Sequence, residues 1–274
     1  MMVDPSMSAV AADSLDDGIR RVESPLDDSW MRDSGPTFVR CEATAHIDDA
    51  ANGEKDGPQM DRDFVAAIDW IFNGWGRQSW ARWGNDKLLG SRVASLAGMP
   101  LVHSRLVLEG GAFLVDGEGT AVVTRTVLLD PRRNPGLSQD AVENELHRML
   151  GVDTVSWLPY GLTRDYDEFG TRGHVDMVAA IPEPGTILVH EQRDRGHPDY
   201  ERSRRIISTL STSRDAKGRQ LTVATVPSPR QCFDDDGRPN EFSYLNHYAV
   251  NGALIACTFE DENDEIALDI LRQA

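Results

Sequence analysis

Gly170-Thr-Arg-Gly-His-Val-Asp176 is a polar stretch that ends just before an apolar run from Val178 to Ile181. Alternate residues of a strand point to the same face, so the spacing predicts that His174 and Asp176 project side by side from the start of a buried strand. A histidine beside a carboxylate can serve as a general acid or base near neutral pH. The alternative is a structural His–Asp pair at a strand end, and the rest of the chain decides between the two.

The same order of elements recurs along the chain. Hydrophobic periodicity and turn residues predict a strand–strand–helix–strand unit that begins near four positions: Asp33, Leu106, His174 and Phe242. The spacing of about 70 residues fits a repeated supersecondary unit. The fold class expected is therefore α/β, built from repeats, with an open and non-repeating α/β sheet as the alternative.

The boundaries of the predicted elements follow from alternation, turn residues and helix caps. The strands are expected at Leu106–Val115, Thr120–Leu129, His174–Ile181, Thr186–His190, Phe242–Val250 and Leu254–Phe259. The helices are expected at Asn85–Ala97, 138–150, Pro198–Leu210 and Asp261–Arg272.

Repeats of this kind bury their faces against neighbours, and a ring must close to remove its edges. The last unit shows no closing strand. A short strand at 18–22 closes a unit whose beginning is not seen, and residues 1–20 show no regular pattern. We therefore expect a ring that is incomplete at both the N- and the C-terminus, within one domain over residues 1–274 that carries a polar surface insertion at 42–62.

Composition limits the partners. A net charge of −17 argues against nucleic acid, which needs a basic patch. No apolar run is long enough for a membrane helix, and the start of the chain does not resemble a secretory signal. The cysteines Cys41, Cys232 and Cys257 are widely spaced, without a C-x-x-C or zinc pattern, which suits a reducing compartment. We predict a cytoplasmic protein without a metal site.

Several patches carry unusual polar residues near strand ends. Asp33 follows Trp30 in the first, where turn capping is the simpler explanation. Glu109 precedes two glycines in an apolar context, where a carboxylate is costly to bury unless it is paired. Carboxylates, a histidine and an aromatic residue suit recognition of a planar guanidinium, whose donors form a fixed fork.

Four of these motifs together resemble the agmatine deiminase family, which belongs with the bacterial-type peptidylarginine deiminases in the superfamily of guanidine-modifying enzymes. They occur in order over about residues 18–274: Trp30-Met-Arg-Asp-Ser-Gly-Pro36, Glu109-Gly-Gly111, Arg133-Asn-Pro135 and Gly173-His-Val-Asp176. The resemblance implies a pentein-like, pseudo-symmetric α/β propeller of five strand–strand–helix–strand units. It also implies hydrolysis of agmatine to N-carbamoylputrescine, in polyamine synthesis, with release of ammonia.

The resemblance also assigns roles. A cysteine thiolate attacks the guanidinium carbon and a covalent thiouronium intermediate is then hydrolysed. Asp33 and Asp176 would hold the guanidinium nitrogens, His174 would be the general acid/base, Glu109 would orient His174, and Trp30 would line the substrate pocket. No cofactor is implied, the partner is a small cationic guanidine substrate, and homo-oligomerisation stays open.

The chain departs from the family pattern in its cysteines. The family nucleophile lies in a glycine-rich stretch near the C-terminus, and none of the three cysteines matches it. The 274-residue chain is thus expected to be inactive by itself. Two alternatives stay open: an inactive remnant or non-catalytic guanidinium-binding protein, and a related arginine-type deiminase or amidinotransferase. Met177, which stands where many relatives carry Asn, leaves the exact substrate open.

Overall fold

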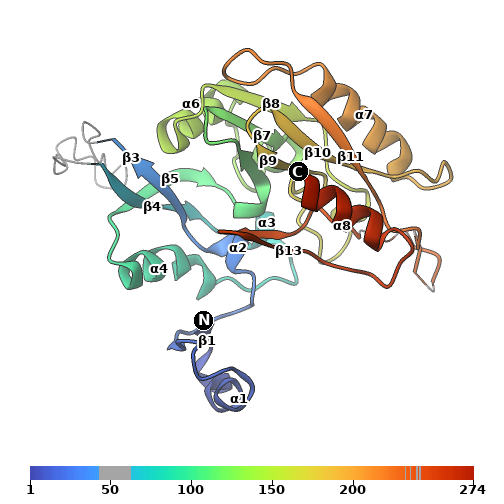
Figure 1. Ribbon diagram of the computed structural model, residues 1–274. Helices are drawn as coiled ribbons and strands as arrows, with labels where there is room; N and C mark the ends of the chain where they lie inside the picture. Colours follow the sequence, from blue (N-terminus) through green and yellow to red (C-terminus); the bar gives the residue numbers. More distant parts are fainter. Residues whose placement is uncertain (43–62, 232, 235, 239, 241) are drawn as a thin grey trace. The chain divides into compact units, whose positions relative to one another are not determined.

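The computed structural model describes residues 1–42, 63–231, 233–234, 236–238, 240 and 242–274 (Figure 1). They form two compact units, Met1–Gly110 and Gly111–Ala274, which we describe in turn. The insertion predicted at 42–62 lies outside the described residues from position 43 onward. Across the described ranges, no helix combines the length and the apolarity that a membrane crossing requires.

The first unit has one main sheet and a smaller strand pair. Its elements, in chain order, are β1 (Met2–Val3), η1 (Pro5–Met7), α1 (Ser8–Ser14), β2 (Val22–Glu23), α2 (Met31–Ser34), β3 (Thr37–Cys41), β4 (Phe64–Ile71), α3 (Gly74–Arg77), η2 (Asp86–Leu88), α4 (Leu89–Ala97) and β5 (Leu101–Val107).

The main sheet of the first unit has the order β3-β4-β5. β3 and β4 are antiparallel, and β5 runs parallel to β4. A parallel connection needs a crossover, which α4 supplies while it packs against β4 with Leu89 and Ala94 buried. This arrangement is the predicted strand–strand–helix–strand unit.

The N-terminal residues are regular, so the expectation that residues 1–20 lack a pattern is wrong. β1 and β2 pair in parallel, with Met2 opposite Val22, and α1 lies between them in the chain. Each strand is only two residues long, which is too short for periodicity to define; of the strand predicted at 18–22, only Val22 belongs to β2.

The second unit repeats the arrangement of the main sheet. Its elements are η3 (Gly110–Ala112, which begins at the last residue of the first unit), β6 (Phe113–Val115), β7 (Thr120–Thr124), α5 (Arg125–Leu128), α6 (Gln139–Leu150), β8 (Thr154–Leu158), η4 (Arg164–Tyr166), β9 (Ala179–Glu183), β10 (Thr186–Glu191), α7 (Asp199–Ser211), β11 (Thr222–Pro227), β12 (Tyr248–Val250), β13 (Ala253–Ile255) and α8 (Asp264–Gln273).

Two sheets in this unit share one topology. In each, an antiparallel hairpin is followed by a helix and by a strand that is parallel to the second hairpin strand: β6-β7-α6-β8 and β9-β10-α7-β11. Together with the sheet of the first unit, they confirm the predicted repeat. The helix caps also agree, because Ser138 accepts from the Ala141 N–H and Gly151 ends α6 in the left-handed conformation.

The predicted strand Leu106–Val115 is wrong, because it spans two sheets. Leu106 and Val107 complete β5, and β6 begins only at Phe113. The intervening Glu109-Gly-Gly111 segment turns the chain from one sheet to the next. The predicted strand Thr120–Leu129 similarly ends at Thr124, where α5 begins.

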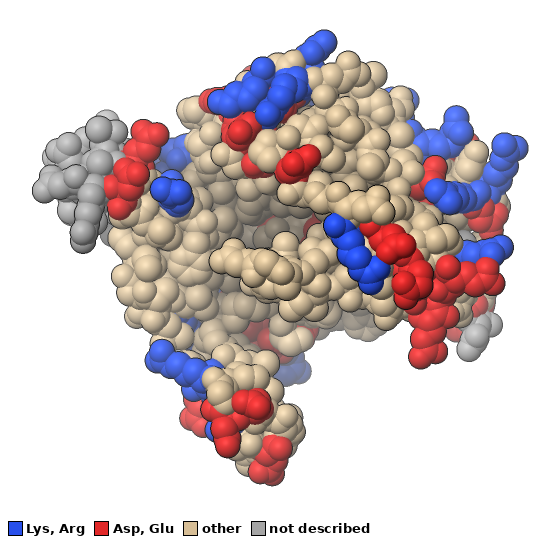
Figure 2. All heavy atoms as spheres, viewed as in Figure 1, with Lys and Arg blue, Asp and Glu red and all other residues tan. Residues whose placement is uncertain are grey.

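The fourth repeat begins later than predicted. Phe242–Leu245 is not a strand; the hairpin of β12 and β13 starts at Tyr248. Tyr244 is instead buried, and its hydroxyl donates to Asp264 Oδ1 of α8 at 2.6 Å. Figure 2 shows acidic side chains gathered around the start of α8, where Asp264 and Glu265 form the first turn and interact favourably with the helix dipole.

A hydrophobic core joins the two complete sheets of the second unit. All five residues of the central strand β7 are buried, as expected for a strand covered on both faces. α7 contributes Ile206 and Leu210 to the cluster around β9 and β10. The cluster consists of Val122, Leu158, Leu162, Val175, Val178, Ala179, Ile187, Val189, Ile206, Leu210 and Leu221.

Leu210→Ala should lower the free energy of unfolding by about 2–5 kcal/mol, because it removes apolar contacts and leaves a cavity in this core. Urea unfolding measures the change. Leu137→Ala is the matched control, since Leu137 is 40% exposed while Leu210 is fully buried. Equal effects of the two variants would contradict the packing described for α7.

Candidate active site

His174 and Asp176 form a buried pair in the second unit. His174 Nδ1 lies 3.9 Å from Asp176 Oδ1. The two residues are 3% and 7% exposed, so both side chains are buried. The pairing that the sequence predicted is therefore present.

The backbone that carries the pair differs from the prediction. His174 and Asp176 lie in a turn before β9, so the predicted strand from His174 to Ile181 is wrong at its start. The Val175 carbonyl accepts from the N–H groups of Val178 at 3.0 Å and Ala179 at 2.9 Å. These bonds close the turn and delay the strand.

One carboxylate holds this turn. Asp165, in η4, is 3% exposed and accepts from the N–H groups of Gly173 at 2.6 Å and His174 at 2.9 Å. Its carboxylate also accepts from the Thr171 N–H at 2.6 Å and from the Thr171 hydroxyl at 2.8 Å. A buried carboxylate needs several donors, and the turn supplies them. Sequence reasoning missed Asp165, although an acidic residue just before a glycine-rich turn is a usable signal.

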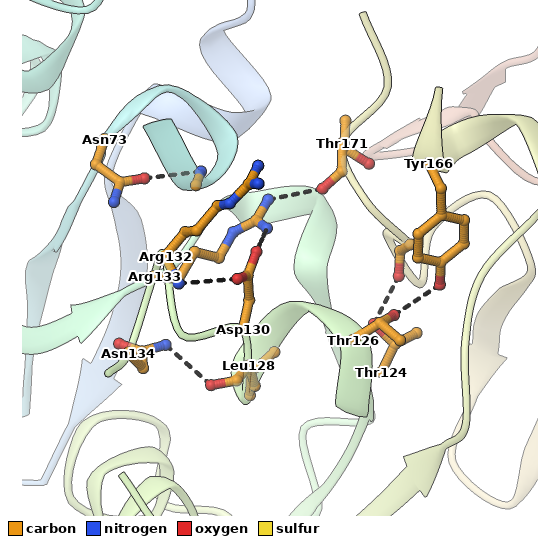
Figure 3. A network of polar contacts seen from close by, with 12 residues as sticks. Asn73, Thr124, Thr126, Leu128, Asp130, Arg132, Arg133, Asn134, Tyr166 and Thr171 are labelled. Carbon is orange, nitrogen blue, oxygen red and sulfur yellow. Dashed lines mark hydrogen bonds and ion pairs between the residues drawn. The ribbon is translucent and has the colours of Figure 1, made fainter. Parts of the chain in front are cut away.

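Glycine is required at position 173. Its φ of +110° is rare for residues with a side chain. A Cβ there would also lie 2.4 Å from the Tyr166 hydroxyl and 2.5 Å from Thr126 Oγ1. These two oxygens are hydrogen-bonded at 2.7 Å, and the Thr124 hydroxyl donates to the Gly173 carbonyl at 2.6 Å (Figure 3). The turn is therefore packed on both sides.

A residue from the segment before β12 contacts this turn. Asn246 Nδ2 donates to the Met177 sulfur at 3.0 Å. Met177 directly follows Asp176, so this contact links the turn to the segment before β12. A thioether is a weak acceptor, and the contact is correspondingly modest.

In the first unit, Asp33 is a buried member of α2. Trp75 Nε1 donates to Asp33 Oδ2 at 2.9 Å, and both residues are less than 10% exposed. Trp30, one turn earlier in the chain, is 55% exposed. Asp33, the predicted substrate carboxylate, thus has the Trp75 indole as a partner. Trp30, which was predicted to line the substrate pocket, lies at the surface.

Trp75 lies in a left-handed turn. Gly74, Trp75, Gly76 and Arg77 have φ values of 69°, 53°, 82° and 58°. The turn is closed because the Arg77 N–H donates to the Asn73 carbonyl at 3.0 Å, and the Gly76 N–H donates to the Asn73 side chain at 2.9 Å. Figure 3 includes this Asn73 contact. A left-handed conformation costs about 1–2 kcal/mol for a residue with a Cβ.

Aromatic packing offsets part of this cost. The Trp75 ring stacks on Trp80 with centroids 5.1 Å apart and meets the edge of Phe72 at 5.0 Å. Sequence reasoning missed Trp75, for which a tryptophan between two glycines was the available signal.

Glu109 is fully buried in the first unit. A Cβ on Gly110 would lie 2.0 Å from the Arg32 carbonyl oxygen, so the first and second motifs lie against each other here. In the second unit, Gly111 O accepts from the Asp176 N–H at 3.2 Å. The predicted contact of Glu109 with His174 stays a prediction, because the two residues belong to different units.

The described cysteines lack an activating environment. Cys41 lies in β3 and burial raises the pKa of its thiol, which disfavours the thiolate. Cys257 is exposed and its thiol donates to the Asn246 carbonyl at 3.8 Å. Cys232 lies outside the described residues.

A second buried histidine lies apart from this turn in the sequence. His190 is in β10, and burial lowers its pKa to about 4, although Asp199 acts in the opposite direction. His197 Nδ1 lies 3.7 Å from Asp199 Oδ2, and this carboxylate also accepts from the Thr163 hydroxyl at 2.6 Å.

Among the residues that the structure describes, no His, Cys, Asp or Glu cluster is arranged to hold a metal ion.

Comparison with known proteins identifies the family. The model of the Porphyromonas-type peptidyl-arginine deiminase family matches residues 1–274. A Streptomyces coelicolor protein named "Putative agmatine deiminase" is 47% identical over 273 residues, which are 100% of this chain and 75% of that protein. Agmatine deiminase of Medicago truncatula is 38% identical over 282 residues, covering 95% of this chain and 72% of the relative.

A solved structure agrees with these relatives. The agmatine deiminase of Enterococcus faecalis superposes with a TM-score of 0.84 at 29% identity, over 99% of this chain and 74% of that chain. The matches place this mixed α/β protein among hydrolases that act on C–N bonds. The chain belongs to the Porphyromonas-type peptidyl-arginine deiminase family.

Trp75→Phe should destabilise the first unit by about 1–3 kcal/mol, because a buried Asp33 oxygen loses its indole donor. A double-mutant cycle with Asp33→Ala, followed by urea unfolding, measures the coupling between the two side chains. Trp30→Phe is the control at an exposed position. A coupling energy near zero would show that the Trp75–Asp33 contact does not contribute.

Lowering the pH should destabilise the second unit through His190. Its folded pKa of about 4 lies below the ordinary 6.5, so its contribution is complete above pH 6.5 and is lost as the pH falls toward 4. The loss is about 3 kcal/mol, which denaturant unfolding at several pH values measures. His190→Asn should flatten this dependence, whereas His147→Asn should not, because the His147 side chain is 64% exposed. Equal slopes in both variants would contradict the assignment.

Proposed function

We propose that the protein hydrolyses the guanidine group of agmatine to give N-carbamoylputrescine and ammonia. The observation that supports this most is the buried His174–Asp176 pair, with 3.9 Å between Nδ1 and Oδ1, in a chain whose relatives are named agmatine deiminases. An acid/base group beside a carboxylate is what cleavage of a cationic C–N bond requires.

Asp33 and Asp176 bind the guanidinium in this proposal. Each carboxylate can accept two N–H groups of the planar cation, and charge-assisted bonds of this kind are strong in a buried site. The Trp75 indole occupies Oδ2 of Asp33 and fixes the plane of the carboxylate. Trp30 faces the cation with its ring, because aromatic faces attract guanidinium groups.

His174 transfers protons. The nucleophilic sulfur attacks the guanidinium carbon, and the C–N bond breaks as His174 donates a proton to the departing ammonia. Neutral His174 then takes a proton from water, whose oxygen attacks the same carbon and expels the thiolate. Glu109 orients the imidazole, as carboxylates commonly do for catalytic histidines.

The nucleophile is none of the three cysteines of this sequence. The raised pKa of Cys41 and its place in β3 argue against it, and Cys257 donates to a carbonyl at the surface. The chain spans about three quarters of the length of these relatives. Serine at positions 41, 232 and 257 should leave ammonia release by the natural gene product unchanged.

The repeats are proposed to surround the substrate. Three sheets of identical topology and a fourth hairpin support a propeller of strand–strand–helix–strand units, with the catalytic residues at equivalent places in successive units. His174, Asp176, Glu109 and Asp33 would then converge near the pseudo-symmetry axis.

His174→Ala in the full-length natural gene product should lower ammonia release from agmatine by about 1000-fold, because general acid/base catalysis is lost. Asp33→Asn and Asp176→Asn should raise the KM for agmatine by about tenfold or more, because each removes a charged acceptor. A coupled ammonia assay gives both constants. His147→Ala, which changes an exposed histidine of α6, is the control.

The proposal would be wrong if His174→Ala released ammonia as fast as the unmodified gene product, or if the unmodified gene product released no ammonia from agmatine. Comparison of agmatine with free arginine and with a peptidyl-arginine substrate distinguishes agmatine hydrolysis from a related deimination. Faster turnover of either arginine compound would shift the assignment to that substrate.

A further inference from the structure

Arg133 belongs to a sequence motif, Arg133-Asn-Pro135, that has no role in the proposed mechanism. The residue follows α5 and is 2% exposed, with no exposed area on its side chain. A guanidinium is costly to bury, and a buried ion pair adds little net stability compared with apolar residues of similar size. The placement of its donors therefore needs another explanation.

The guanidinium connects two segments of the second unit. Arg133 Nη1 donates to Asp130 Oδ2 at 3.2 Å, and Nη2 donates to the Thr171 carbonyl at 2.7 Å (Figure 3). The planar fork of arginine can make both bonds at once, which a lysine ammonium cannot do in the same geometry.

The Arg133 side of this link is itself fixed. The Asp130 carbonyl accepts from the N–H groups of Arg133 at 2.9 Å and Asn134 at 2.8 Å. Asn134 Nδ2 donates to the Leu128 carbonyl at 3.0 Å, at the end of α5. The guanidinium thus extends from a loop that is held to a helix end.

The other side of the link leads to His174. Thr171 is bound to the Asp165 carboxylate by its N–H and its hydroxyl, and the same carboxylate accepts from the N–H of His174. The Thr171 hydroxyl also lies 3.4 Å from the His174 N–H. Arg133 therefore holds the Thr171 carbonyl, while the Asp165 carboxylate binds both Thr171 and the N–H of His174.

We propose that Arg133 is a positioning residue for His174, acting through Thr171 and the turn that Asp165 holds. This inference rests on the proposed role of His174 as acid/base. Loss of the Arg133 bond would free the Thr171 carbonyl and allow the turn to shift, and misplacement of a catalytic group by about 1 Å can cost about 100-fold in rate.

The test uses the full-length natural gene product with ¹⁵N-labelled histidine. Arg133→Met removes the fork, Arg133→Lys keeps the charge, and His174→Gln assigns the His174 imidazole resonances. The matched control is Arg272→Met, because Arg272 forms an exposed ion pair with Asp269 of the same i,i+3 spacing.

Arg133→Met should shift the His174 imidazole resonances and their titration, and lower kcat for agmatine about 100-fold, with KM changed by less than about threefold. Arg133→Lys should recover part of kcat, while Arg272→Met should leave both readouts unchanged. If Arg133→Met does not fold, Arg133→Lys decides by the same two readouts.

Unchanged His174 resonances in Arg133→Met, whatever its kcat, would overturn the positioning role. If the parent protein released no ammonia, the proposed function would fail, but the His174 resonances would still decide whether Arg133 positions the imidazole.

Discussion

The local structure of the candidate site depends on the Asp165 carboxylate. It accepts from Thr171, Gly173 and His174, so that a short polar segment becomes a defined turn. Each donor reduces the cost of burying the charge, and the charge in turn fixes each donor. His174 and Asp176 are brought together by this mutual requirement rather than by the alternation of a strand.

The repeat architecture was predictable from the sequence because its signals are local. The hairpin of β9 and β10 turns at Pro184 and Gly185, between the two strands predicted there, and the predicted helices at 138–150 and Pro198–Leu210 match α6 and α7 closely. Caps, turns and apolar periodicity act within a few residues, and tertiary contacts reinforce them here.

The site geometry was less predictable because it depends on contacts between segments distant in the chain. Trp75 and Asp33 are 42 residues apart, and Arg133 and Thr171 are 38 apart. Propensity carries no information on such pairs. The errors at Leu106–Val115 and at Phe242 have the same origin, since an apolar run was assigned to one strand although its residues serve two sheets or pack against a helix.

The left-handed turn at Gly74–Arg77 has a consequence for how this region can vary. Glycine is the residue that the backbone at position 75 accepts most easily, yet glycine there would remove the indole that donates to Asp33. Glycine at position 75 would thus relieve the backbone strain but leave Asp33 without its indole donor. A replacement at position 75 must therefore tolerate a positive φ and still donate to Asp33, or the turn must change together with its carboxylate.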